Sequence, residues 1–167
     1  MKTLLIIAKK GFRDEELFDT KDALEEEGIE TVITSSEVGS CEGVLGGDAE
    51  AELAIREVEP SDYDAVLFIG GGGAAVYFND PIAHEIAKKA SLENKVLGAI
   101  CITPSILANA GLLKGKRVTS YPSEKDNLES KGAIFESDDV VIDERLVTAN
   151  GPKAARLFGE AVASLLT

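Results

Sequence analysis

Short apolar runs alternate along the chain with longer segments in which apolar residues recur at helical spacing. The runs that predict the main strands are Lys2–Ala8, Glu30–Ser35, Asp64–Ile69 and Lys95–Ile100. Helices are predicted at Asp14–Glu27, Pro81–Ala90, Thr103–Gly111 and Pro152–Leu166. Shorter strands are predicted at Val118–Ser120, Ala133–Phe135, Val140–Ile142 and Leu146–Ala149, with a hairpin or loop at Ser40–Gly47. Because strands alternate with helices, the pattern indicates an α/β fold whose mostly parallel sheet is covered on both faces.

The composition narrows the class of protein. The 167 residues, 44% of them hydrophobic, suffice for a single globular domain, 1–167, and no repeat or linker divides them. The formal net charge of −13 repels phosphate backbones and anionic membrane surfaces, so neither nucleic acid nor a membrane is an expected partner. No apolar run approaches the ~20 residues that span a bilayer, and no signal peptide is recognised, so we expect a cytoplasmic protein.

The loops that follow the predicted strands are the places to search for a site, because parallel sheets bind ligands at the carboxyl ends of their strands. Those loops are Lys9–Glu16, Gly70–Gly73, Cys101–Pro104 and Tyr121–Asp126. The chain has two cysteines without a CxxC partner, which is too few for a disulfide framework. Both cysteines are expected to be free thiols.

Cys101 is the candidate nucleophile. It lies at a strand-to-helix turn, where the free N–H groups and the dipole of the following helix favour a thiolate. Its neighbours Ala99 and Thr103 partly match the small residues that flank the nucleophile of a hydrolase elbow. The alternative is a small buried hydrophobic cysteine. The glycine loop Gly70–Gly73 and the carboxylate of Glu16 favour the functional interpretation, since both are expected at the same sheet edge.

Several motifs occur in an order that resembles the ThiJ/PfpI superfamily over nearly the whole chain. They are Ala99-Ile100-Cys101-x-x-Pro104, the strand and glycine run AVLFIGGG, the Lys10–Glu16 segment, and Val118-Thr119-Ser120-Tyr121-Pro122. The resemblance implies a flavodoxin-like three-layer sandwich related to class I glutamine amidotransferases, without a cofactor, and a homodimer or higher homo-oligomer. It also implies that Cys101 is the reactive thiol, that Glu16 hydrogen-bonds to it with a raised pKa, and that Gly71 and Ile102 supply backbone donors. The residues expected to line the substrate pocket are Gly70, Gly72, Thr103 and Tyr121.

The chain departs from this family's pattern at two positions. The peptidase-like branch places a histidine directly after the cysteine, where this chain has Ile102. Other branches carry a histidine in the loop where this chain has Tyr121, and a phenol is a poor base near neutral pH. The single histidine, His84, is expected on the surface of the Pro81–Ala90 helix, although a neighbouring subunit could still bring it to a site.

Three functions follow from this interpretation. The first is glyoxalase- or deglycase-like hydrolytic chemistry on small electrophiles such as 2-oxoaldehydes or their protein adducts, with Cys101 assisted by Glu16 alone. The second is a non-enzymatic sensor of oxidative stress, in which an oxidant converts Cys101 to a sulfinate. The third is an intracellular cysteine peptidase or amidase, which Ile102 disfavours.

Other signals carry less weight. The residues Gly70–Ala75 satisfy a dinucleotide-binding pattern, but four consecutive glycines satisfy almost any glycine pattern, and the nearest acid, Glu93, precedes the next strand. His84 and the two cysteines are too few and too scattered for a zinc site, so no metal is expected. Cys41, in the glycine-rich segment, is left open as an exposed second thiol, a residue at a dimer edge, or a residue without a functional role.

Overall fold

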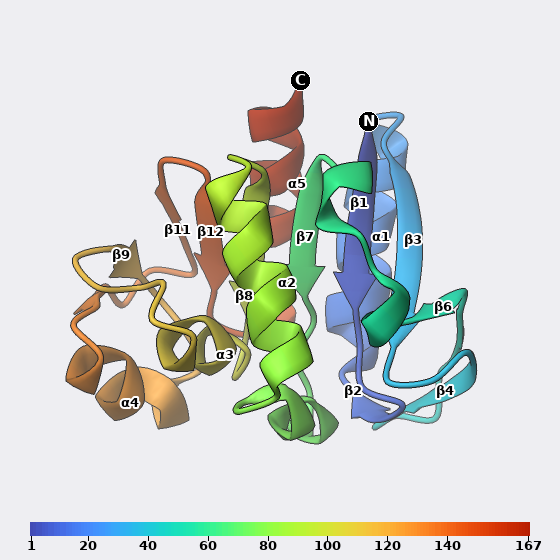
Figure 1. Cartoon of the computed structure of the whole chain (residues 1–167), viewed down its shortest axis with the longest axis horizontal. Helices are drawn as coiled ribbons and strands as arrows, with labels where there is room; N and C mark the ends of the chain where they lie inside the picture. The colour runs from blue at the N-terminus through green and yellow to red at the C-terminus, as the bar shows by residue number, and fades with distance from the viewer.

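The computed structural model describes residues 1–167, and its centre is a seven-stranded sheet in the order β11-β12-β8-β7-β1-β3-β6 (Figure 1). These strands are β1 Lys2–Ile6, β3 Glu30–Ser35, β6 Leu53–Ala54, β7 Ala65–Phe68, β8 Val96–Ile100, β11 Val140–Asp143 and β12 Leu146–Ala149. Neighbouring strands are parallel throughout, except that β11 and β12 form an antiparallel hairpin. The mostly parallel sheet predicted from the alternating pattern is confirmed.

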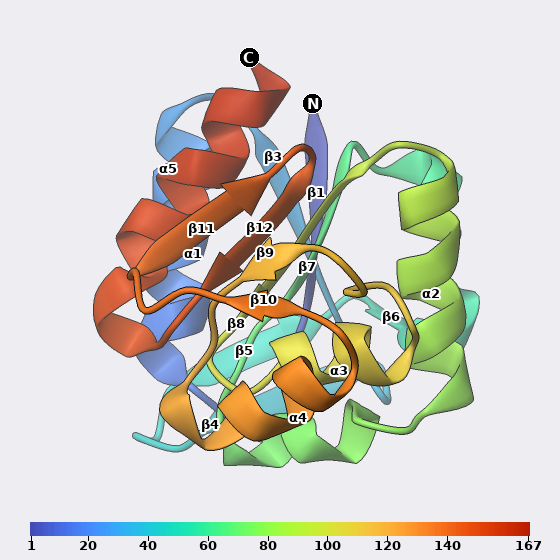
Figure 2. The same cartoon turned by 90° about the vertical axis from the view of Figure 1, so that its left-hand side faces the viewer.

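Helices cover both faces of this sheet (Figure 2). On one face lie α1 Asp14–Glu26 and α5 Ala155–Leu166, and on the other lie α2 Pro81–Leu92 and α3 Pro104–Asn109, with α4 Lys125–Ser130 packed against α3. Two small sheets complete the fold, one of β2 Lys10–Phe12, β4 Gly39–Gly43 and β5 Asp48–Ala51, and one of β9 Arg117–Val118 and β10 Ile134–Phe135. The result is the three-layer sandwich expected from the sequence.

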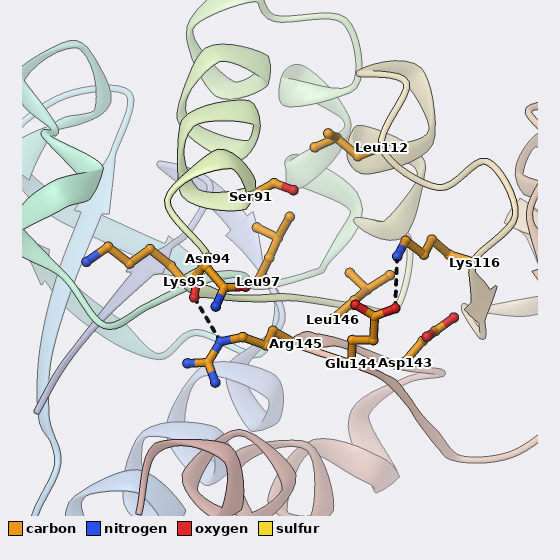
Figure 3. A pocket seen from close by; sticks show the side chains of 10 residues that line it. All are labelled: Ser91, Asn94, Lys95, Leu97, Leu112, Lys116, Asp143, Glu144, Arg145 and Leu146. Carbon is orange, nitrogen blue, oxygen red and sulfur yellow. Dashed lines mark hydrogen bonds and ion pairs between the residues drawn. The ribbon is translucent and has the colours of Figure 1, made fainter.

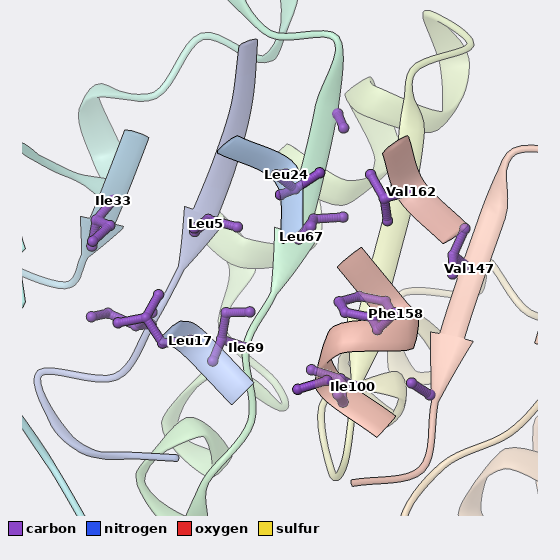
Figure 4. Close-up of a cluster of buried hydrophobic side chains, with 14 of the residues drawn as sticks. Leu5, Leu17, Leu24, Ile33, Leu67, Ile69, Ile100, Val147, Phe158 and Val162 are labelled. Carbon is purple, nitrogen blue, oxygen red and sulfur yellow. The ribbon is translucent and has the colours of Figure 1, made fainter. Parts of the chain in front are cut away.

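The core between the sheet and the α1–α5 pair explains why these two helices form (Figure 4). Leu17 and Leu24 of α1 and Phe158 and Val162 of α5 are fully buried against the inner face of the sheet. Gly159 allows the two helices to approach closely, because a Cβ atom there would lie 2.8 Å from both the carbonyl oxygen of Thr20 and the Cβ of Ala23. Burial of this apolar surface, at about 25 cal/mol per Å², is the main stabilisation of the two helices.

The parallel strands place their carboxyl ends at one edge of the sheet, at the bottom of Figure 1. The loops after β1, β7, β8 and β12 therefore meet there, although they are far apart in the sequence. Asp14, at the start of α1, fixes the β4–β5 hairpin at this edge by accepting hydrogen bonds from the amides of Leu45 (2.9 Å) and Gly47 (2.7 Å). Partial burial of this carboxylate raises its pKa, but these two amides outweigh that effect and the pKa of Asp14 is lowered.

Several predicted bounds are wrong by a few residues. The first strand ends at Ile6 rather than Ala8, because the chain leaves the sheet and forms β2, which pairs with β4. The closing helix begins at Ala155, after a 3₁₀ turn at Pro152–Ala154. The helix predicted to end at Ala90 continues to Leu92. The strand predicted at Val118–Ser120 is limited to β9, since the amide of Thr119 donates instead to the hydroxyl of Thr148 at 2.9 Å.

The structure also places His84, which was expected on the surface, and Cys41, whose role the sequence left open. His84 is half-buried rather than on the surface, and its Nε2 lies 2.8 Å from the carbonyl oxygen of Phe78. Cys41 of β4 is only 1% exposed and belongs to the core on the α1–α5 side of the sheet, so it is not a second exposed thiol.

Candidate active site

Cys101 follows β8 directly and forms a strained elbow. Its φ of +66° lies in the left-handed region, which costs a residue with a side chain about 1–3 kcal/mol. Backbone hydrogen bonds on both sides hold this conformation: its amide donates to Ala149 at 3.0 Å, and its carbonyl accepts from the amide of Tyr121 at 2.8 Å. The turn therefore lifts the side chain out of the line of the sheet, as expected from the partial elbow motif.

The side chain of Thr103 stabilises this turn through hydrogen bonds. Its hydroxyl oxygen accepts from the amide of Ile100 at 2.9 Å and lies within donating distance of the carbonyls of Phe68 (2.9 Å) and Ile100 (2.8 Å). The side chain is fully buried. Thr103 was expected to line the substrate pocket, but the structure places it between the ends of β7 and β8, where it fixes the elbow.

The carboxyl group of Glu16 lies beside the Cys101 thiol. Glu16 is fully buried, its Oε1 accepts from the amide of Gly70 at 2.9 Å, and its carboxyl group hydrogen-bonds to Cys101. Its Oε2 is buried without a hydrogen-bond partner. Gly70 makes this arrangement possible, since a Cβ atom at that position would lie 2.4 Å from Glu16 Oε1 and 2.6 Å from Cys101 Cβ.

The pKa values of these two groups are coupled. Burial raises the pKa of Glu16 to about 7, although the hydrogen bonds with Cys101 and Gly70 act in the opposite direction. Burial and then the negative charge of Glu16 raise the pKa of Cys101 to about 12, while the amides of Gly71 and Ile102 lower it. The backbone donors at the turn favour the thiolate, as expected from the sequence, but burial and the neighbouring carboxylate outweigh them. As the pH rises through about 7 the carboxyl group therefore ionises first, while the thiol keeps its proton.

Gly71 and Gly72 play different parts in the glycine loop. Gly71 has a φ of +109°, and a Cβ atom there would lie 2.4 Å from both the amide nitrogen of Arg13 and the carbonyl oxygen of Gly11. Its amide and that of Ile102, the two donors that the family resemblance implies, lower the pKa of the Cys101 thiol. Gly72 is exposed and faces open space, so the structure does not bring it to Cys101.

An open pocket of about 360 Å³ lies next to the elbow, and we call it the entrance pocket. It is lined by Arg13, Glu15, Tyr121, Pro122, Asn150, Gly151, Pro152 and Lys153. Tyr121 was expected here and is 47% exposed. Arg13, Asn150 and Lys153 were not identified from the sequence. The signal that could have found the last two is the Asn-Gly-Pro turn after a short apolar run, at Leu146–Ala149.

A second hollow, of about 160 Å³, lies at the opposite edge of the sheet, where β8 begins (Figure 3). Leu97, Leu112 and Leu146 contribute apolar walls, and charged side chains such as Lys116 and Glu144 surround them. This hollow is remote from the elbow, which follows the other end of β8. No group of three or more His, Cys, Asp or Glu side chains is arranged to hold a metal ion, and none of the helices has the length and hydropathy of a membrane-spanning segment.

The fold and the site define an α/β protein with a strained cysteine elbow and a buried carboxyl group at the carboxyl edge of its sheet. Residues 1–165 match the profile of the DJ-1/PfpI family. The chain belongs to this family.

Similar proteins include enzymes named for two activities. Deglycase PfpI of Pyrococcus furiosus is 36% identical over 149 residues, which cover 89% of this chain and 90% of that protein. The glutathione-independent glyoxalase DJR-1.2 of Caenorhabditis elegans is 26% identical over 155 residues, or 93% and 83% of the two chains. Among solved structures, the ThiJ/PfpI domain protein of Brachyspira murdochii superposes with a TM-score of 0.97 at 32% identity, covering 99% of this chain and 95% of that one.

The structure supplies no histidine to the elbow. The residue after Cys101 is Ile102, and Tyr121 occupies the loop that contacts the elbow from the other side. His84 lies on α2 and is bonded to the backbone of Phe78. Glu16 is therefore the titratable side chain that hydrogen-bonds to the thiol.

Proposed function

We propose that this protein is a cysteine-dependent enzyme of the glyoxalase or deglycase type, with Cys101 as nucleophile and Glu16 as its proton acceptor and donor. The observation that carries the proposal is the buried Glu16 carboxyl group, with a pKa of about 7, hydrogen-bonded to the thiol. A group with such a pKa is suited to take and return protons near neutral pH. The names of the two similar enzymes agree with this chemistry.

The reaction can be written for a 2-oxoaldehyde. The thiol proton moves to Glu16 while the sulfur bonds to the aldehyde carbon, and the resulting alkoxide takes a proton to give a hemithioacetal. The hydrogen of that carbon is then removed by the Glu16 carboxylate and returned to the neighbouring ketone carbon, while the hydroxyl proton of the hemithioacetal moves to the ketone oxygen. This step oxidises the first carbon to a thioester and reduces the second to an alcohol. Water hydrolyses the thioester to a 2-hydroxy acid, and no external oxidant or reductant is required.

The backbone donors assist the first step. The amides of Gly71 and Ile102 lower the pKa of Cys101, so they stabilise the thiolate as it forms. With a single carboxyl group serving both proton transfers, we expect slower turnover than in a site that also contains an imidazole.

Conversion of methylglyoxal to lactate tests the proposal. The wild-type protein should produce lactate, and Cys101→Ala should reduce the rate to that of the uncatalysed reaction. Cys41→Ala is the matched control, because Cys41 is a buried cysteine of β4 and is not part of the elbow. Activity that survives Cys101→Ala would contradict the proposal.

The same samples distinguish the alternative functions. If the wild-type protein forms no lactate but Cys101 is converted stoichiometrically to a sulfinate by peroxide, the oxidation sensor is supported and the enzyme is rejected. Cleavage of peptide substrates that depends on Cys101 would favour the peptidase instead. Peptide cleavage is not expected here, since no histidine stands beside the sulfur to protonate a leaving amine.

A further inference from the structure

We propose that the entrance pocket selects electrophiles that carry a carboxylate close to the reacting carbon, and that Lys153 is the residue that provides this selection. The inference rests on the proposed function, because it assigns a substrate class to the Cys101 site. The argument depends on where the pocket lies, which charges line it, and which of those charges are already paired.

The entrance pocket is built from the same three segments that hold the elbow. Arg13 contributes one wall, and its amide donates to the carbonyl of Gly70 at 2.8 Å, next to the Glu16 contact. Tyr121 contributes a second wall, and its amide binds the carbonyl of Cys101. The third wall follows β12, whose last residue, Ala149, accepts from the amide of Cys101. The pocket therefore adjoins the elbow through these three segments, although Cys101 is not itself one of its lining residues.

The charge of this pocket is opposite to that of the whole protein. The chain has a formal net charge of −13, whereas the pocket lining carries two cations and one carboxylate, a net charge of +1. A local positive charge in a negatively charged molecule concentrates anions at that position. One uncompensated charge suits a singly charged carboxylate.

The pairing within the pocket identifies Lys153 as the cation that remains free. The guanidinium of Arg13 binds the carboxylate of Glu15 through two hydrogen bonds, from Nε at 2.8 Å and from Nη2 at 3.0 Å. Lys153 forms no ion pair, and its side chain is exposed. Because Glu15 already neutralises Arg13, an incoming carboxylate gains most from Lys153.

The other walls fit a small molecule with a short apolar part. Tyr121, Pro122 and Pro152 provide apolar surface, and Asn150 provides an amide that can hydrogen-bond to a carbonyl or carboxylate oxygen. The pocket thus presents the features needed for a short 2-oxo compound that ends in a carboxylate.

Two alkylating agents that differ in charge test this inference directly. Iodoacetate and iodoacetamide both react by bond formation between the Cys101 sulfur and the CH₂ carbon, with loss of iodide and transfer of the thiol proton to Glu16. Second-order rate constants for Cys101 are measured by peptide mass spectrometry in the wild-type protein and in Lys153→Gln, Lys153→Glu and Lys88→Gln. Lys88 is the matched control, since it is an exposed lysine of α2 that is not part of any ion pair or of the entrance pocket.

The measured quantity is the ratio of the iodoacetate rate to the iodoacetamide rate. At low ionic strength Lys153→Gln should lower this ratio about fivefold, as expected for the loss of one exposed charge, and Lys153→Glu should lower it further. Added salt should lower the ratio of the wild-type protein but have little effect on that of Lys153→Gln. Lys88→Gln should leave the ratio unchanged.

The outcomes separate failure of this inference from failure of the proposed function. If Cys101 reacts with both agents and the ratio is the same in Lys153→Gln as in the wild type, carboxylate selection by Lys153 is rejected while the nucleophile remains. If Cys101 reacts with neither agent, the proposed nucleophile is rejected, and the inference is rejected with it.

Discussion

At the scale of single residues, Cys101 and Glu16 act as one titrating unit. The buried carboxyl group and the half-buried thiol lie next to Gly70, and the effects are unequal: Glu16 raises the pKa of Cys101, whereas the hydrogen bond with Cys101 lowers the pKa of Glu16. A pair coupled in this way loses its two protons in separate steps, so the reactivity of the thiol depends on the state of the carboxyl group. The sequence identified both residues, which are 85 positions apart, because each follows a strand that ends at the same sheet edge.

The coupling predicts the shape of the pH profile of Cys101 alkylation. As the pH rises through about 7, Glu16 ionises and can accept the thiol proton, so the wild-type rate should rise and then bend towards a plateau. In Glu16→Gln no acceptor is present, and the rate should increase about tenfold per pH unit without a bend near 7 until the thiol itself ionises. Iodoacetamide kinetics from pH 5 to 10 measure both profiles. A Glu16→Gln profile with the same bend would show that another group accepts the proton.

Gly70 should tolerate no side chain. In Gly70→Ala the added Cβ atom would overlap Glu16 Oε1 and Cys101 Cβ, so the carboxyl group and the thiol must separate. We expect the rate of Cys101 alkylation at pH 7.5 to fall at least tenfold, with a loss of unfolding free energy of about 1–3 kcal/mol. Gly72→Ala is the matched control, because a Cβ atom there meets nothing within 4 Å. Equal rates in the two variants would disprove the close packing of the pair.

At the scale of secondary-structure elements, the crossing of α1 and α5 determines how tightly one helical layer packs. Gly159 lies at the crossing, against the backbone of Thr20 and the side chain of Ala23. The hydroxyl of Thr20 also donates to the carbonyl of Ala155 at 3.1 Å, in a fully buried position. The short distance between the two helices therefore requires glycine at position 159.

The substitution Gly159→Ala at this crossing has two opposite effects on stability, a gain from helix propensity and a loss from packing. Alanine favours a helix over glycine by about 1 kcal/mol. The added Cβ atom of Gly159→Ala, however, would lie 2.8 Å from a backbone oxygen that cannot rotate away, and such overpacking costs about 1–3 kcal/mol. We expect a net loss of stability in urea unfolding. Ser164→Ala, on the exposed side of α5, should instead raise the stability by a few tenths of a kcal/mol.

The elements that could be predicted from the sequence are those whose own residues form a complete apolar run or a clear apolar period. The strands β1, β7 and β8 are continuous apolar runs and were located to within two residues. β9 and β10 are two residues long and overlap the strands predicted at Val118–Ser120 and Ala133–Phe135, whereas β6, also two residues long, is defined only by its tertiary pairing and was not predicted. α4 was missed because Leu128 is its single buried residue, which is too little for a periodic pattern.

The candidate site divides in the same way. Cys101, Glu16 and the glycine loop carry local signals, namely a strand end, a turn and an uncommon run of glycines. Asn150 and Lys153 belong to a recognisable Asn-Gly-Pro turn, but their position beside the elbow depends on the parallel pairing of β12 with β8. The pairing partner of a four-residue strand is a property of the assembled sheet, so the entrance pocket could be recognised only from the structure.

At the scale of the whole molecule, the buried Glu16 carboxyl group should make stability depend on pH. Folding raises the pKa of Glu16 to about 7, so the folded state binds this proton more tightly than the unfolded state, where the pKa is about 4.3. The stabilisation is fully present below pH 4.3 and is lost as the pH rises to 7. The loss amounts to roughly 4 kcal/mol, since one pKa unit corresponds to 1.36 kcal/mol.

Comparison with Glu16→Gln isolates this contribution from the repulsion among the many other carboxylates. The variant resembles the protonated wild-type residue, so its unfolding free energy should match that of the wild type near pH 4 and exceed it increasingly towards pH 8. Urea unfolding at several pH values provides the measurement. Parallel stability curves for the two proteins would mean that folding leaves the pKa of Glu16 unchanged.

The two thiols of this chain differ in accessibility to solvent. Because of this difference, the labelling rate of the buried thiol can report local unfolding. Cys41 belongs to the β4–β5 hairpin and its side chain is buried. The carboxylate of Asp14 anchors this hairpin to the start of α1. Once Cys101 has been blocked, any further uptake of a thiol reagent must await a transient opening of that hairpin. The rate of this second labelling step therefore measures the opening free energy of the small sheet without a spectroscopic probe or an engineered cysteine.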